Sequence, residues 1–63
     1  MEYTDARELV RIRHELRTLA RGAGEVAAPL LERMRSLASR DAAESAAVQT
    51  EVQRWQFVFR LEA

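Results

Sequence analysis

Residues 5–22 read DARELVRIRHELRTLARG and decide the fold class of the chain. Asp5 and Glu8 have the spacing of a capping box at the first turn of a helix, and Gly22 stands where a glycine commonly ends one. The large apolar residues between them follow at spacings of 3, 4 and 3, on one helical face: Leu9, Ile12, Leu16 and Leu19. The stretch therefore predicts an amphipathic helix over about residues 5–21.

The segment after this helix contains both glycines and the only proline of the chain. We interpret residues 22–28 as a loop, because the glycines interrupt the helical pattern. Pro29 lacks an N–H group and fits best in the first turn of a new helix. A second helix is therefore predicted over about residues 29–39.

A second capping signal follows directly. Asp41 and Glu44 repeat the spacing of the first capping box and predict a third helix over about residues 41–61. The alanines that follow Asp41 equally allow this helix to be continuous with the preceding one. We favour a tight turn near residues 39–41 over one long helix.

The last segment carries large apolar residues on more than one side of a helix. Its main stripe has spacings of 4, 3 and 4: Val48, Val52, Trp55 and Phe59. Phe57, Val58 and Leu61 lie off this stripe, because each residue advances a helix by about 100°. Residues 54–61 also alternate as a strand would, but the chain offers no second strand to pair with, so we favour a helix.

Length and composition leave few sources of stability. The chain has 63 residues, no Cys, one His and a net charge of zero, with ten arginines against ten acidic residues. It therefore has neither a disulfide nor a Cys/His zinc site, and a core of this size supplies only about 3–5 kcal/mol. Because helix-forming residues dominate, we predict a single all-α domain, a small helical hairpin or three-helix bundle completed by oligomerisation.

Nothing in the sequence indicates an enzyme, a metal site or a cofactor site. His14 is the only His and lacks the nucleophile and orienting acceptor that a general base needs, so we place it on the polar face of the first helix. The two glycines form neither a P-loop nor a dinucleotide-binding fingerprint. We predict a cytoplasmic protein, because no apolar run is long enough to span a bilayer and the acidic N-terminus does not resemble a signal peptide.

The apolar excess at the C-terminus indicates a protein–protein interaction surface. We predict a small interaction module, such as an adaptor, a chaperone-like protein or a regulatory subunit. It would self-associate as a homo-oligomer, most simply a homodimer, or bind a helical partner. The predicted partner-binding residues all belong to the last segment: Trp55, Phe57, Val58, Phe59 and Leu61.

The alternative is a regulator that binds nucleic acid through the arginines of the first helix. Five of the ten arginines lie within residues 1–21, whereas residues 41–63 carry a net charge of −2. Neighbouring arginines on a helix repel each other, so negative charge from elsewhere is expected to offset this repulsion. We rank the acidic last segment, from the same or a second chain, first as the source of that negative charge. An acidic partner ranks second and nucleic acid last.

Overall fold

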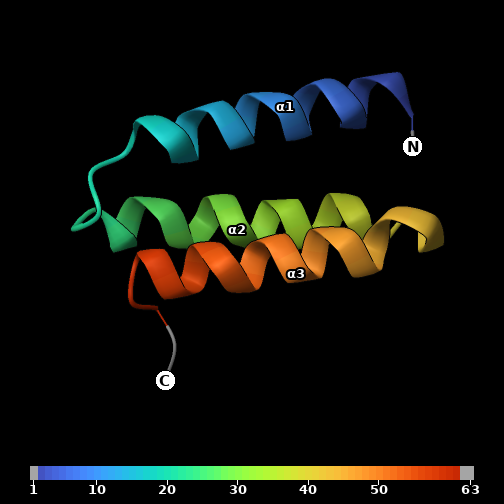
Figure 1. The fold of residues 1–63 in the computed structure, drawn as a ribbon. Coiled ribbons are helices and arrows are strands. Elements are labelled where there is room, and N and C mark those ends of the chain that lie inside the picture. Colours follow the sequence, from blue (N-terminus) through green and yellow to red (C-terminus); the bar gives the residue numbers. More distant parts are fainter. Residues whose placement is uncertain (1, 62–63) are drawn as a thin grey trace.

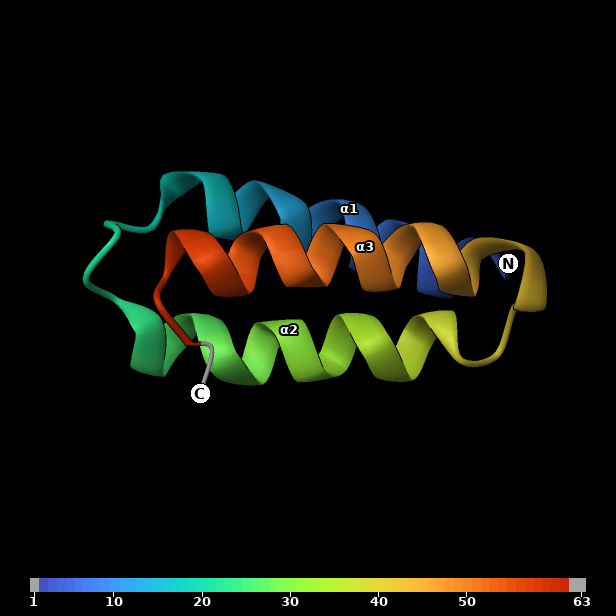
Figure 2. The same ribbon diagram turned by 60° about the horizontal axis from the view of Figure 1, so that its bottom comes forward.

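The computed structural model describes residues 2–61, which fold into three helices. Helix α1 spans Tyr3–Thr18, α2 spans Gly24–Ala38 and α3 spans Ala42–Val58. Helices α1 and α3 run in the same direction and α2 runs in the opposite one (Figure 1). The α1–α2 connection and the C-terminal end of α3 lie at the same end of the molecule in both views (Figure 2). Residues 2–61 contain no strand, which confirms the all-α prediction and the helical reading of the last segment.

The core joins the predicted stripe of α1 to one face each of α2 and α3. Leu9, Ile12 and Leu16 are buried, and Leu19 packs against them at the partly buried edge. The other two helices and the turn after α3 supply the rest of the buried cluster: Ala27, Leu31, Met34, Leu37, Ala38, Val48, Val52 and Phe59. The apolar faces of all three helices thus meet in one cluster within a single chain.

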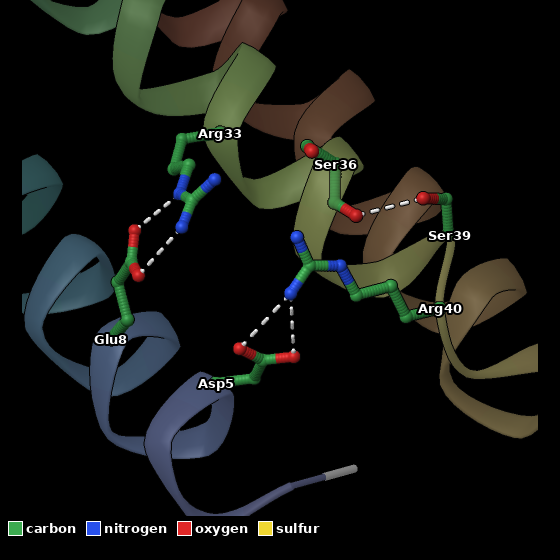
Figure 3. A network of polar contacts seen from close by, with 6 residues as sticks. All are labelled: Asp5, Glu8, Arg33, Ser36, Ser39 and Arg40. Carbon is green, nitrogen blue, oxygen red and sulfur yellow. Dashed lines mark hydrogen bonds and ion pairs between the residues drawn. The ribbon is translucent and has the colours of Figure 1, made fainter.

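The first turn of α1 differs from the predicted capping box. The helix begins two residues before Asp5, and Glu2 occupies the N-cap position without a side-chain hydrogen bond. Asp5 instead accepts hydrogen bonds from Arg40 Nη1 at 3.4 and 3.5 Å, and Glu8 binds Arg33 through both carboxylate oxygens (Figure 3). The spacing that fits a capping box also places two acids on the face of α1 that meets α2.

The end of α1 lies earlier than predicted, at Thr18 instead of near Arg21. Leu19 adopts an extended backbone at the C-cap, and its N–H donates to the Glu15 carbonyl at 3.1 Å. The Thr18 hydroxyl donates to the same carbonyl at 2.9 Å. The chain therefore leaves the helix with the Leu19 side chain still on the core, before it reaches Gly22.

Helix α2 begins at Gly24, five residues before the predicted start, and Pro29 lies inside the helix instead of in its first turn. Residues 24–28, predicted to be a loop, are helical. This added turn buries Ala27 completely. It also brings Gly24 against Leu61: a Cβ atom added to Gly24 would lie 3.0 Å from the Leu61 side chain. This packing outweighs the helical hydrogen bond that proline cannot make.

A turn at residues 39–41 separates α2 from α3, so the alternative of one continuous helix is wrong. The Ser39 hydroxyl donates to the Ser36 carbonyl at 2.7 Å where α2 ends (Figure 3). Asp41 adopts an extended backbone, and its side chain accepts a hydrogen bond from the Ala43 N–H at 3.0 Å. Asp41 is therefore the N-cap of α3, as predicted.

Candidate interaction surface

The five predicted partner-binding residues divide into two groups. Phe59 is only 5 % exposed and belongs to the core, and Trp55 and Leu61 pack against the core in partly buried positions. Phe57 and Val58 face outward, with 74 % and 38 % of their surface exposed. Helix α3 ends at Val58, before the predicted end near residue 61. The apolar area offered to solvent at this end of α3 therefore comes mainly from Phe57 and Val58.

The chain reverses direction immediately after α3. Arg60 has a φ angle of 57°, in the left-handed region that glycine usually occupies after a helix. The Leu61 N–H donates to the Gln56 carbonyl at 2.8 Å and the Arg60 N–H donates to the Phe57 carbonyl at 3.2 Å. These are the two bonds of a Schellman motif. Although Leu61 lies off the main helical stripe, this turn carries it back against the start of α2.

Trp55 and Phe59 close the core at this end. Their rings lie one helical turn apart and stack, with centroids 5.9 Å apart and an angle of 30° between the ring planes. Paired aromatic rings contribute both buried area and favourable ring contacts. The core is thus closed by side chains other than Phe57, whose ring remains exposed to solvent.

A shallow hollow at this end of the molecule places two arginines beside Phe57 and Val58. Its remaining lining comes from the loop after α1 and the turn after α3: Arg21, Gly22 and Arg60. Both arginines are exposed, and neither forms an ion pair with another of residues 2–61. The hollow therefore combines exposed apolar surface with two positive charges.

A second hollow lies between α1 and α3. Its lining comes from both helices: Arg13, Arg17, Ala47, Thr50, Glu51 and Arg54. Arg13 donates to both carboxylate oxygens of Glu51 at 2.7–3.0 Å and so joins α1 to α3. The hydrogen bonds that Arg13 donates to Glu51 raise the pKa of Arg13. Arg17 and Arg54 are exposed and form no ion pair within the described part of the chain.

The two hollows lie on the same face of the molecule. Arg54 and Val58 line different hollows but lie on one face of α3, because Arg54 precedes Val58 by four residues, about one turn of helix. We name this face the arginine groove, and its defining residues are Arg13, Arg17, Arg21, Glu51, Arg54, Phe57, Val58 and Arg60. With five arginines and one glutamate, it carries a formal charge of +4 in a chain whose net charge is zero.

Sequence reasoning found part of this groove. The sequence predicts an arginine cluster on the first helix, and the predicted compensation by the acidic last segment is observed for Arg13, which pairs with Glu51. The same segment also brings two further arginines to the groove, Arg54 and Arg60, although its net charge is negative. The sequence signal that could have placed Arg54 in the groove is its position one helical turn before Val58, on the same face of α3.

No metal-binding cluster accompanies this surface within residues 2–61. His14 is exposed on α1, and the described residues contain no group of three side chains able to hold a metal ion. No helix within residues 2–61 has the length and apolar character needed to cross a membrane. The chain matches no protein-family model, no curated protein and no solved structure.

Proposed function

We propose that the chain is a protein-interaction module that binds a partner protein through Phe57 and Val58. The observation that carries this proposal is the 74 % exposure of Phe57 beside Val58, on a fold whose core is closed by other side chains. Covering an exposed phenylalanine with a partner is worth about 1.5–3 kcal/mol. Aromatic side chains that become desolvated are also frequent anchors of protein interfaces.

The arginines beside Phe57 favour a different protein over a second copy of this chain. In a twofold-symmetric dimer the same surface patch appears on both sides of the interface. Arg21 and Arg60 line the hollow with Phe57. A dimer built on Phe57 would therefore bring four arginines together, and like charges facing each other at an interface are unfavourable. A heterologous partner with acidic groups avoids this repulsion.

The test begins with a photo-cross-linking amino acid placed at Phe57 and, as a matched control, at Val10. Val10 is 64 % exposed and lies on α1, outside the arginine groove. We expect a discrete adduct with a second protein from position 57 and none from position 10. The protein identified in the adduct is then purified and titrated with the wild-type chain and with the Phe57→Ala and Val10→Ala variants.

Binding should weaken by about tenfold or more in Phe57→Ala, which corresponds to about 1.4 kcal/mol, and should not change in Val10→Ala. Light scattering of the wild-type chain across a dilution series should give the mass of a monomer. Equal binding by the two variants, or equal cross-linking from both positions, would overturn the proposal. An adduct of twice the chain mass would identify a second copy as the partner instead.

A further inference from the structure

We infer that the arginine groove binds an acidic helix of the partner protein, with an apolar side chain of that helix covering Phe57. This inference rests on the proposed function and adds the chemistry of the partner. The groove lies between α1 and α3, which run in the same direction (Figure 1). A third helix laid between two such helices buries its inner face along both of them, which is a common mode of peptide recognition.

The spacing of the arginines suits a helical ligand. Arg13 and Arg17 are four residues apart on α1, so they lie about 6 Å apart along its axis, and Arg21 follows in the loop after α1. Carboxylates at the same interval on a partner helix recur at the same distance. Arg54 faces this row from α3, and Arg60 stands at the end of the groove that contains Phe57.

Most of the positive charge of the groove is not paired within the fold. Ion pairs within the chain engage the arginines of α2 and of the α2–α3 turn: Arg33 with Glu8, Arg35 with Glu32 and Arg40 with Asp5. In the groove only Arg13 has such a pair among residues 2–61. Arginine binds carboxylates with two parallel hydrogen bonds, so its exposed guanidinium groups suit glutamate and aspartate side chains.

Two features favour an acidic helix over a nucleic acid strand. Glu51 already engages Arg13 inside the groove, so a phosphate backbone, which is negative along its whole length, meets a carboxylate and an occupied arginine at that point. A helix can place a neutral residue opposite Glu51 and acids opposite the arginines. The end of the groove is formed by Phe57 together with Val58; a base can stack on the Phe57 ring, but the aliphatic Val58 beside it is better covered by an apolar side chain.

The probe is a fluorescently labelled synthetic helical peptide of about 16 residues, the length of α1. It carries glutamates at intervals of four on one face and a leucine one turn beyond each end of that row. Matched probes replace the glutamates with glutamine, or replace the leucines with serine, and a short single-stranded DNA serves as a separate probe. Binding to the full-length chain is measured by fluorescence anisotropy.

The acidic peptide should bind, and its binding should weaken as the salt concentration rises. Both the glutamine peptide and the serine peptide should bind more weakly. Arg17→Glu and Arg54→Glu should each weaken binding by about tenfold. Arg11→Glu makes the same change of charge on α1 outside the groove, and it should leave binding within about twofold of the wild type. Circular dichroism confirms that each variant remains helical.

Absence of binding by the acidic peptide, or an equal loss in Arg11→Glu and Arg17→Glu, would overturn the inference. Tighter binding of the DNA than of the acidic peptide would also overturn it and would favour nucleic acid as the ligand. These failures are distinguishable from failure of the proposed function. If Phe57→Ala still weakens binding of the cross-linked partner, the interaction surface stands and only its acidic selectivity is lost.

Discussion

Replacing Arg60 with glycine is expected to stabilise the fold and to weaken partner binding. Arg60 has a φ angle of 57°, and the left-handed conformation costs an L-residue about 1–2 kcal/mol. Glycine removes this cost, but its greater freedom in the unfolded chain offsets the gain by about 0.5–1 kcal/mol. The Arg60→Gly variant should therefore gain about 0.5–1 kcal/mol in the free energy of unfolding.

The assay is urea and thermal unfolding followed by circular dichroism. A gain of about 1 kcal/mol raises the Tm of a domain of this size by about 4–8 °C. Arg54→Gly is the matched control, because it removes the same side chain from the interior of α3, where glycine costs about 1 kcal/mol. Opposite signs for the two variants would isolate the backbone effect from the loss of a positive charge.

A loss of stability in Arg60→Gly would refute this reasoning, because it would mean that the Arg60 side chain contributes more to the fold than its backbone conformation costs. The expected gain also bears on function. An arginine at a position that favours glycine lowers stability, and such strain tends to occur at functional sites. Arg60→Gly should accordingly bind the acidic peptide more weakly than the wild type while unfolding at a higher temperature.

Three further variants test other parts of the fold. Leu16→Ala removes a buried side chain and should lower the free energy of unfolding in urea by about 2–5 kcal/mol. Val10→Ala, at an exposed position, should change it by less than about 0.5 kcal/mol, and similar losses in both variants would contradict the assignment of Leu16 to the core. The hydrogen bond from Arg33 lowers the pKa of Glu8 below its ordinary 4.5, so wild type should be more stable than Glu8→Gln at neutral pH. That advantage should disappear as the pH falls through the lowered pKa; a difference independent of pH would exclude the ion pair as its source. Asp41→Ala removes the N-cap of α3 and should lower the Tm, and an unchanged Tm would show that the cap is dispensable.

The parts of the fold that could be predicted are those with a local cause. The spacing of Leu9, Ile12 and Leu16 decides which face of α1 is buried, whatever the partner helix is. Asp41 caps α3 through a hydrogen bond to a residue two positions away. Both signals are complete within a few residues of sequence, so the sequence alone is enough to interpret them.

The features that could not be predicted depend on distant residues. Asp5 and Glu8 have the spacing of a capping box, but their partners lie 35 and 25 residues away along the chain, in the α2–α3 turn and on α2. The early start of α2 brings Gly24 close to Leu61, a residue far away along the chain. The position of Leu61 in turn depends on an arginine in a conformation typical of glycine, which no sequence pattern signals.

The candidate site combines both kinds of feature. That Phe57 lies off the packed stripe follows from helical periodicity, and its exposure agrees with this. The burial of Phe59 and the partial burial of Trp55 also follow from the stripe, once α2 provides a surface to pack on. The arginine groove could not be read from the sequence, because it requires α1 and α3 to lie with the same direction on one face.

The most direct test of the central claim compares the unfolding free energies of Phe57→Ala and Phe59→Ala. If Phe57 serves a partner and Phe59 serves the core, Phe59→Ala should lose about 3–5 kcal/mol, which is enough to unfold a domain of this size. Phe57→Ala should remain within about 0.5 kcal/mol of the wild type at every protein concentration. A loss of stability in Phe57→Ala comparable to that in Phe59→Ala would contradict the claim, because it would show that folding itself requires Phe57 to be buried.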